Sequence, residues 1–166
     1  MSADETIVRD ERESDHEAVW QVHRLAFSSD AEARLVDELR ASGKAAISLV
    51  AERAGAVVGH ILFSPLEAPV ASLSLAPVGV LPDAQKQDIG SALIRMGLER
   101  ARIVGWSAVF VVGDPNYYSR FGFDADRAEA YASPYSGPHF MVLSLGTSSL
   151  PPAGPVVYPE PFAALG

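Results

Sequence analysis

The residues with the clearest chemical potential lie in the stretch "LPDAQKQDIGSALIRMGLERAR", residues 81–102. A proline turn and a short polar run lead into Gly90 and an apolar helix pattern. The first amides of a helix have no acceptor inside the helix, so such a start can bind an anion. Asp88, however, places an anion of its own in this loop. The sequence thus poses the question of whether the loop binds a phosphate or whether the aspartate fills that place.

Residues 89–104 carry the strongest helix pattern in the chain. Polar side chains recur at i, i+4 and i+7 (Arg95, Glu99, Arg102), and the core-facing positions are expected to be Ile89, Leu93, Met96 and Ala101. The stretch "SAVFVVG" that follows is typical of a buried strand, and residues 70–82 predict a strand before the helix. A strand, a helix and a buried strand in succession predict a parallel pair with a crossover. Because proline cannot donate to a ladder, Pro77 marks where the first of these strands stops pairing.

The preceding sequence predicts a strand near residues 6–8, two helices and a strand pair. The helices have Ser14 with Glu17 and Ser29 with Glu32 at capping-box spacing. The apolar stripe of the first helix is expected at Ala18, Val22, Leu25 and Ala26. Residues 45–53 and 56–65 are expected to form a hairpin around residues 54–55, and a late strand is expected at 140–145.

Length, charge and residue content limit the kinds of protein that this chain can be. The 166 residues are sufficient for one domain, expected over residues 1–145, followed by a Pro-rich extension at 146–166 that holds five of the 12 prolines. A net charge of −8 argues against nucleic-acid binding. The acidic N-terminus is unlike a signal peptide, no apolar run is long enough to cross a membrane, and cysteine is absent. These features favour a cytoplasmic protein with neither nucleic acid nor membrane as a partner.

Several common catalytic motifs are missing. The chain has no G-x-S-x-G elbow, no G-x-x-x-x-G-K-[ST] loop and no G-x-G-x-x-G. Its four histidines show no metal-ligand spacing, and His16 and His23, seven residues apart on the first helix, are interpreted as ordinary surface residues. No metal site is predicted.

Two stretches resemble the GCN5-related N-acetyltransferase (GNAT) superfamily, in particular its small bacterial branch. The first is "VGVLPDAQKQDIGSAL", which matches a strand ending V-x-P followed by [QR]-x-x-G-x-[GA] and a helix; the second is "YSRFGF", residues 118–123, which matches Y-x-x-x-G-F. The order of expected elements from residue 6 to about 145 also agrees. The resemblance implies an α/β (α+β) fold with a mixed, mostly antiparallel sheet flanked by helices, one parallel strand pair being joined by the coenzyme-binding helix.

The resemblance further implies transfer of an acetyl group from acetyl-CoA directly to an amine. The pyrophosphate would lie at the start of the helix, with Lys86 beside a phosphate, and the pantetheine arm would add to the strand at Val78 and Val80. Tyr118 would give a proton to the departing thiolate, since a phenol is protonated at neutral pH. The coenzyme-binding residues implied are Val78, Gly79, Val80, Gln85, Lys86, Gln87, Asp88, Ile89, Gly90, Ser91 and Ala92.

Some questions stay open at this level. The base that deprotonates the amine is either Glu67, by position alone, or a water chain. The acceptor is a small-molecule or peptide amine of unspecified identity, whose pocket is expected to use residues 126–139 with Tyr131 and Tyr135 as contacts. Dimerisation, common on this fold, is not decided.

The family pattern has glycine at position 88. Two like charges about 4 Å apart repel by roughly 1 to 4 kcal/mol, which would weaken binding about five- to a thousandfold. The alternative is therefore a degenerate GNAT fold that binds a ligand or a protein, with the tail docking in trans, and transfers nothing.

Overall fold

A computed structural model of the chain describes residues 5–146, 150–151 and 153–165. Its centre is a six-stranded sheet in the order β1-β2-β3-β4-β5-β7, in which only the β4–β5 pair is parallel. The strands are β1 (Thr6–Asp10), β2 (Ile47–Arg53), β3 (Ala56–Leu66), β4 (Ser72–Val80), β5 (Ala108–Val112) and β7 (Phe140–Ser144). The predicted mixed, mostly antiparallel sheet with one parallel pair is confirmed.

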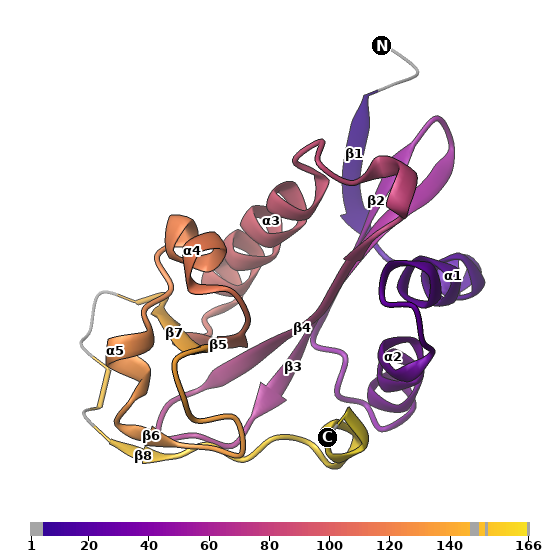
Figure 1. Ribbon diagram of the computed structural model, residues 1–166. Helices are drawn as coiled ribbons and strands as arrows, with labels where there is room; N and C mark the ends of the chain where they lie inside the picture. The colour runs from indigo at the N-terminus through magenta and orange to yellow at the C-terminus, as the bar shows by residue number, and fades with distance from the viewer. Residues whose placement is uncertain (1–4, 147–149, 152, 166) are drawn as a thin grey trace.

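Helices cover both faces of this sheet (Figure 1). Helix α3 (Ile89–Val104) makes the crossover between β4 and β5 and packs on Leu49, Ile61 and Leu73. Helices α1 (His16–Ala26) and α2 (Ala31–Ala41) pack on the other face, where Val50 and Leu62 point. Successive strand residues face opposite sides, so one sheet supplies both cores. The short helices α4 (Pro115–Tyr118) and α5 (Ala125–Ala128) follow β5.

Strands β4 and β5 pair over a short stretch and then diverge (Figure 1). Their parallel register covers only Ser72 to Ser74 of β4, opposite Ala108 to Phe110. On the other side of β4, the register with β3 shifts between Ile61 and Phe63, opposite the segment that contains Pro77. The expectation that pairing stops near Pro77 is confirmed, and the second half of β4 has one open edge.

Several predicted details of the helices are wrong. Leu25 and Met96 are 51% and 43% exposed, and the buried residues of α1 are Val19, Val22 and His23. Helix α1 begins at His16, after a 3-10 turn η1 (Glu13–Asp15), and tertiary packing turns the face with Val19, Val22 and His23 toward the sheet. Neither serine forms the predicted capping box: the residues at the N-cap positions of α1 and α2 are Asp15 and Asp30, and neither aspartate side chain caps its helix. The Ser29 hydroxyl accepts only a 3.4 Å hydrogen bond from the Ala31 amide. The Asp15 carboxylate instead accepts hydrogen bonds from the Arg12 amide and the Arg9 guanidinium.

The described part of the C-terminal extension folds back on the domain. Strand β8 (Gly154–Pro155) pairs with β6 (Tyr131–Ala132), and Val157 exchanges backbone hydrogen bonds with Glu67. The Tyr131 hydroxyl donates to the carbonyl of Pro151. The turn η4 (Glu160–Leu165) places Phe162, 3% exposed, in the same core cluster as α2.

No helix in the described ranges is long and apolar enough to cross a membrane.

Candidate active site

The turn before α3 presents backbone amides to a cavity of about 450 Å³. Lys86 and Asp88 both adopt left-handed backbone conformations, with φ of 63° and 64°, which turn the chain sharply into the helix. Asp88 occupies the N-cap position, but its side chain is exposed and accepts no capping hydrogen bond. The amides of the first helical turn are therefore not taken by this carboxylate, and the positive end of the helix dipole faces the cavity.

Two cations and two hydroxyls complete the walls of this cavity. Lys86 comes from the loop and Arg120 from η3 (Ser119–Phe121), the 3-10 turn that follows α4. The Arg120 guanidinium lies 4.8 Å from the centre of the Tyr117 ring. The Tyr117 and Ser91 hydroxyls are hydrogen-bonded at 3.2 Å. Free amides, two cations and hydroxyl donors are the groups that bind phosphate in proteins. We name this hollow the α3 cavity.

Most of the predicted coenzyme-binding residues line the α3 cavity. Those brought together there are Val80, Gln85, Lys86, Asp88, Ile89, Gly90 and Ser91. Gln87 and Ala92 do not line it: the Gln87 side chain accepts a 2.6 Å hydrogen bond from Arg53, and the Ala92 amide donates to the Asp88 carbonyl. Arg120 was not predicted, although it lies two residues after Tyr118 within "YSRFGF".

The open edge of β4, formed by the second half of the strand, begins next to the α3 cavity at Val80. The Leu81 amide donates to Val58 of β3 at 2.8 Å, so by alternation the backbone groups of Val78 and Val80 point away from β3. The Gln85 side chain donates to the Val80 carbonyl at 2.9 Å on that outer side. Backbone groups on a strand edge without a neighbouring strand can bind an extended, amide-containing ligand. Here the Val80 carbonyl already has Gln85 as one partner.

Tyr118 lies where β4 and β5 diverge. It is 9% exposed and lines a second cavity, of about 220 Å³, together with Pro77, Val78 and Val112. Burial, and next to it the neighbouring Tyr117, raise the pKa of Tyr118 to about 12. A Cβ atom on Gly113 would lie 2.4 Å from the Tyr118 ring, so a glycine at 113 lets the ring pack against the end of β5. We name this hollow the Tyr118 cavity.

The carboxylate in the Tyr118 cavity is Glu32 of α2, not the predicted Glu67. Glu67 is exposed at the end of β3, where its backbone pairs with Val157. The residue before it, Leu66, pairs with Ser72, which is five residues before Pro77, or roughly 17 Å along the strand. The sequence predicted only a capping role for Glu32. The spacing of residues along α2 carries no information about the place where β4 and β5 diverge, which Glu32 faces.

Two histidines lie fully buried beneath the open part of β4. His23 Nε2 and His60 Nδ1 are 2.8 Å apart, and His60 Nε2 is 2.8 Å from the Ser48 hydroxyl. The interpretation of His23 as a surface residue is therefore wrong. Burial, and secondarily Arg40, lower the pKa of His23 to about 4, and burial also lowers that of His60. A Cβ on Gly79 would lie 2.8 Å from His23 Nδ1, so the absence of a side chain at Gly79 admits this pair.

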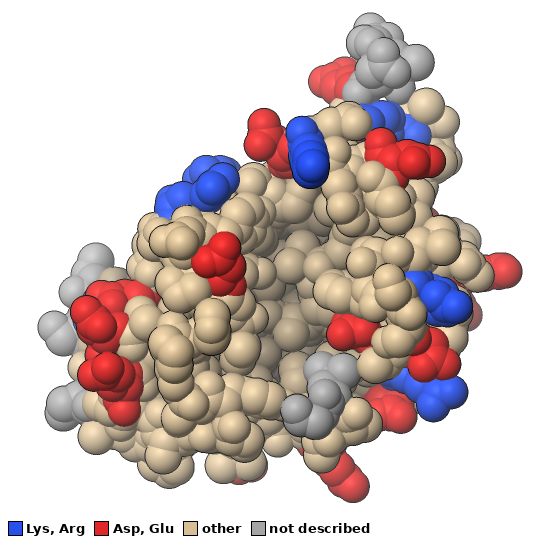
Figure 2. Space-filling model, in the orientation of Figure 1, with Lys and Arg blue, Asp and Glu red and all other residues tan. Residues whose placement is uncertain are grey.

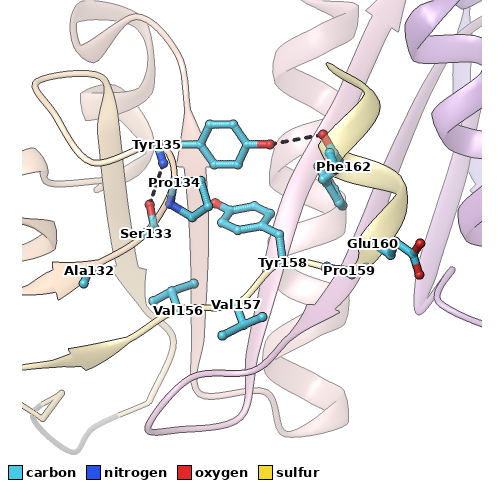
Figure 3. A pocket seen from close by; sticks show the side chains of 11 residues that line it. Ala132, Ser133, Pro134, Tyr135, Val156, Val157, Tyr158, Pro159, Glu160 and Phe162 are labelled. Carbon is cyan, nitrogen blue, oxygen red and sulfur yellow. Dashed lines mark hydrogen bonds between the residues drawn. The ribbon is translucent and has the colours of Figure 1, made fainter. Parts of the chain in front are cut away.

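The C-terminal segment forms a third hollow, of about 660 Å³ (Figure 3). The Tyr135 and Tyr158 rings are 4.8 Å apart, and the Tyr135 hydroxyl donates to the Phe162 carbonyl at 3.4 Å. Tyr135 lines this hollow, and Tyr131, although 2% exposed, lines a smaller one with Arg127 and Leu150. That these residues contact the acceptor stays a prediction. No group of acidic and histidine side chains suited to a metal ion occurs in the described parts of the chain.

Comparison with known proteins agrees with this geometry. Residues 8–123 match the Acetyltransferase (GNAT) family. The chain is 37% identical to the "uncharacterized N-acetyltransferase YjhQ" of Escherichia coli K12 over 134 residues, 75% of this chain and 74% of YjhQ. It is similar to the crystal structure of Escherichia coli YhbS in complex with CoA, with a TM-score of 0.90, 31% identity and coverage of 100% and 96%. A GNAT acetyltransferase from Brucella melitensis in complex with acetyl-CoA gives a TM-score of 0.81, 36% identity and coverage of 95% and 98%.

The chain therefore belongs to the GNAT family. It is an enzyme of the acyltransferase class, as its relatives named N-acetyltransferases are.

Proposed function

We propose that this protein transfers an acetyl group from acetyl-CoA to an amine. The observation that carries the proposal is the α3 cavity, in which free helix amides lie beside Lys86 and Arg120 and next to the open edge of β4. These groups fit a coenzyme that has phosphates at one end and an amide-containing arm. Relatives over 30% identical were crystallised with CoA and with acetyl-CoA.

The coenzyme's phosphates would bind at Lys86, Arg120 and the amides of the first α3 turn. Val78 and Val80 would hold the pantetheine arm through their outward-facing backbone groups. Bound acetyl-CoA supplies an activated acetyl group, which passes to a neutral amine nitrogen as a C–N bond forms and the C–S bond breaks. Tyr118 holds a proton at its hydroxyl for the departing sulfur, and the proton that the nitrogen loses restores the phenol.

The alternative of a binding protein without activity rested on Asp88 and on the tail. The Asp88 side chain is exposed and does not cap α3, which leaves the amides available. The described tail packs in cis, with Phe162 in the core beside α2. Both observations favour the enzyme.

An amine-panel assay tests the proposal. Purified protein and acetyl-CoA are incubated with primary amines and amino-terminal peptides, free thiol is measured, and the acetylated product is identified by mass spectrometry. The expected result is thiol release that depends on both protein and amine. Binding of acetyl-CoA without transfer to any amine would support the binding-protein alternative.

A further inference from the structure

Glu32 brings a carboxylate into an otherwise apolar cavity. Its Oε1 atom is buried and has no hydrogen-bond partner among the described residues. The Glu32 carboxylate also forms no ion pair with any residue that the structure describes. Glu32 lines the Tyr118 cavity from α2, opposite the diverging strands.

The remaining lining of this cavity does not neutralise Glu32. It consists of apolar side chains and the Tyr118 phenol, and no lysine or arginine is among them. Phe27, 38% exposed, and Leu35 approach from the α1–α2 side, while Leu75 and Val112 come from the sheet. The lining of the cavity therefore holds one carboxylate and no lysine or arginine that could pair with it.

A buried acceptor oxygen without a partner is costly, and the cost rises for a charged group. The stability of α2 does not require the Glu32 oxygen to be buried, because a glutamate in the first helical turn interacts with the helix dipole equally well when its oxygens face water. The Glu32 Oε1 atom is instead buried without a partner, and the side chain lines the same cavity as Tyr118, so this oxygen is suited to a ligand that brings its own hydrogen-bond donor.

We propose that Glu32 binds the acceptor of the reaction, and that this acceptor is a primary amine entering as the ammonium ion with apolar carbon next to the nitrogen. The proposal rests on the proposed function, because it places the amine beside Tyr118. An ammonium group supplies both the positive charge and the hydrogen-bond donors that Glu32 lacks. It gives up one proton to water before the neutral nitrogen attacks, and the second nitrogen proton restores the Tyr118 phenol. Phe27, Leu35 and Leu75 would then contact the adjoining carbon atoms.

The volume of about 220 Å³ suits only the amine-bearing end of a larger acceptor. Figure 2 shows that this face of the molecule is hollowed between the α4–α5 side and the α1–α2 side, with few charged residues along the hollow. The rest of an acceptor has space there. The site therefore selects for the amine and its nearest carbons, and less for the remote part of the molecule.

Calorimetric titration with matched ligands tests the proposal without relying on turnover. The probes are 2-phenylethylamine and hexylamine, each paired with the alcohol that replaces the amine by a hydroxyl. The variants are Glu32→Gln, Glu32→Asp and, as a matched control on the exposed side of α2, Glu38→Gln. We expect saturable binding of at least one amine, with its alcohol bound far more weakly. We expect Glu32→Gln to weaken amine binding about 30-fold or more, which corresponds to loss of one buried charged partner.

The outcomes separate this proposal from the proposed function. Glu38→Gln should bind amines as the parent does, and Glu32→Asp should retain part of the affinity. Equal amine affinity in Glu32→Gln and the parent, or no saturable amine binding by the parent, would overturn the proposal. Acetyl-CoA titrated into the same variants should bind unchanged, and thermal unfolding verifies that each is folded. Failure of acetyl-CoA to bind the parent would instead contradict the proposed function.

Discussion

Asp88 stands where the family pattern has glycine, and its backbone keeps the conformation that glycine would adopt. With φ at 64°, position 88 requires the left-handed conformation that glycine adopts without strain and aspartate tolerates. Its carboxylate is exposed and uninvolved in capping. The loop thus keeps the geometry expected for a phosphate site and adds one negative charge at its rim.

Asp88→Gly should strengthen acetyl-CoA binding and leave the fold intact. Removing a like charge near the phosphates should raise affinity about fivefold or more, since repulsion at about 4 Å is worth roughly 1 kcal/mol even in water. Calorimetry measures the affinity, and urea unfolding measures stability, which should rise by up to about 1 kcal/mol as left-handed strain is relieved. Unchanged affinity would mean that the carboxylate lies away from the bound phosphates.

Tyr118→Phe should lower kcat about a hundredfold or more while the affinity for acetyl-CoA stays within about twofold, because the hydroxyl acts on the leaving sulfur. The buried phenol has a pKa near 12, so its proton is retained in the folded enzyme at every pH below about 11. In the parent, kcat should therefore show no loss between pH 8 and 10 caused by Tyr118. Tyr117→Phe separates the two roles: it removes a hydroxyl of the α3 cavity, so it should lower the affinity for acetyl-CoA more than kcat.

The sequence predicted those site residues that lie in short local motifs, and it missed those that tertiary packing brings to the site. Gly90, Lys86 and Tyr118 lie in short segments whose local order fixes their position. Glu32 and Arg120 acquire their setting from tertiary packing: Glu32 faces strands far away in the chain, and Arg120 reaches the α3 cavity only because α4 packs beside α3.

At the level of elements, the divergence of β4 from β5 creates the site. The parallel pair and its crossover helix were predictable from periodicity, and Pro77 marked the end of pairing. The buried pair of His23 and His60 was not predictable, because a histidine on an amphipathic helix gives no sign of burial. It lies under the same open segment of β4, against Gly79.

This histidine pair should make stability depend on pH. The pKa of His23 is about 4 in the folded protein, against about 6.5 in an unfolded chain. Between these values the unfolded chain binds more protons, so the free energy of unfolding falls as pH drops from about 6.5 to 4, by up to about 1.4 kcal/mol per pH unit from this residue. Below about pH 4 it contributes no further loss.

Urea unfolding at pH 7, 6 and 5 measures this effect. His23→Gln should show a shallower decline than the parent, whereas His139→Gln, which retains both buried histidines, should decline as the parent does. Parallel declines in the parent and His23→Gln would remove His23 as a source of the pH dependence.

At the scale of the whole molecule, the C-terminal segment completes the core. Composition predicted an extended, proline-rich tail but not the two anchors, β8 on β6 and Phe162 beside α2, because proline content does not specify a docking site. The tail also supplies Tyr158 and Phe162 to the third hollow (Figure 3).

Phe162→Ala should destabilise the protein by about 3 kcal/mol, the lower end of the range for truncating a buried phenylalanine to alanine. The lower end is expected because η4 lies near the chain end. Urea unfolding provides the value. Leu25→Ala, at a 51% exposed position on α1, serves as the control and should cost well under 1 kcal/mol. A negligible cost for Phe162→Ala would show that the tail is a passive end.

The most direct test of the account is a calorimetric titration of acetyl-CoA into the parent protein, with Arg120→Gln and Asp88→Gly alongside. The account predicts micromolar binding by the parent, weaker binding when Arg120 is replaced, and tighter binding when Asp88 is replaced. Absence of binding by the parent together with clear binding by Asp88→Gly would contradict it, because the aspartate would then occupy the anion site and the chain would be a ligand-binding or protein-binding relative of these acetyltransferases.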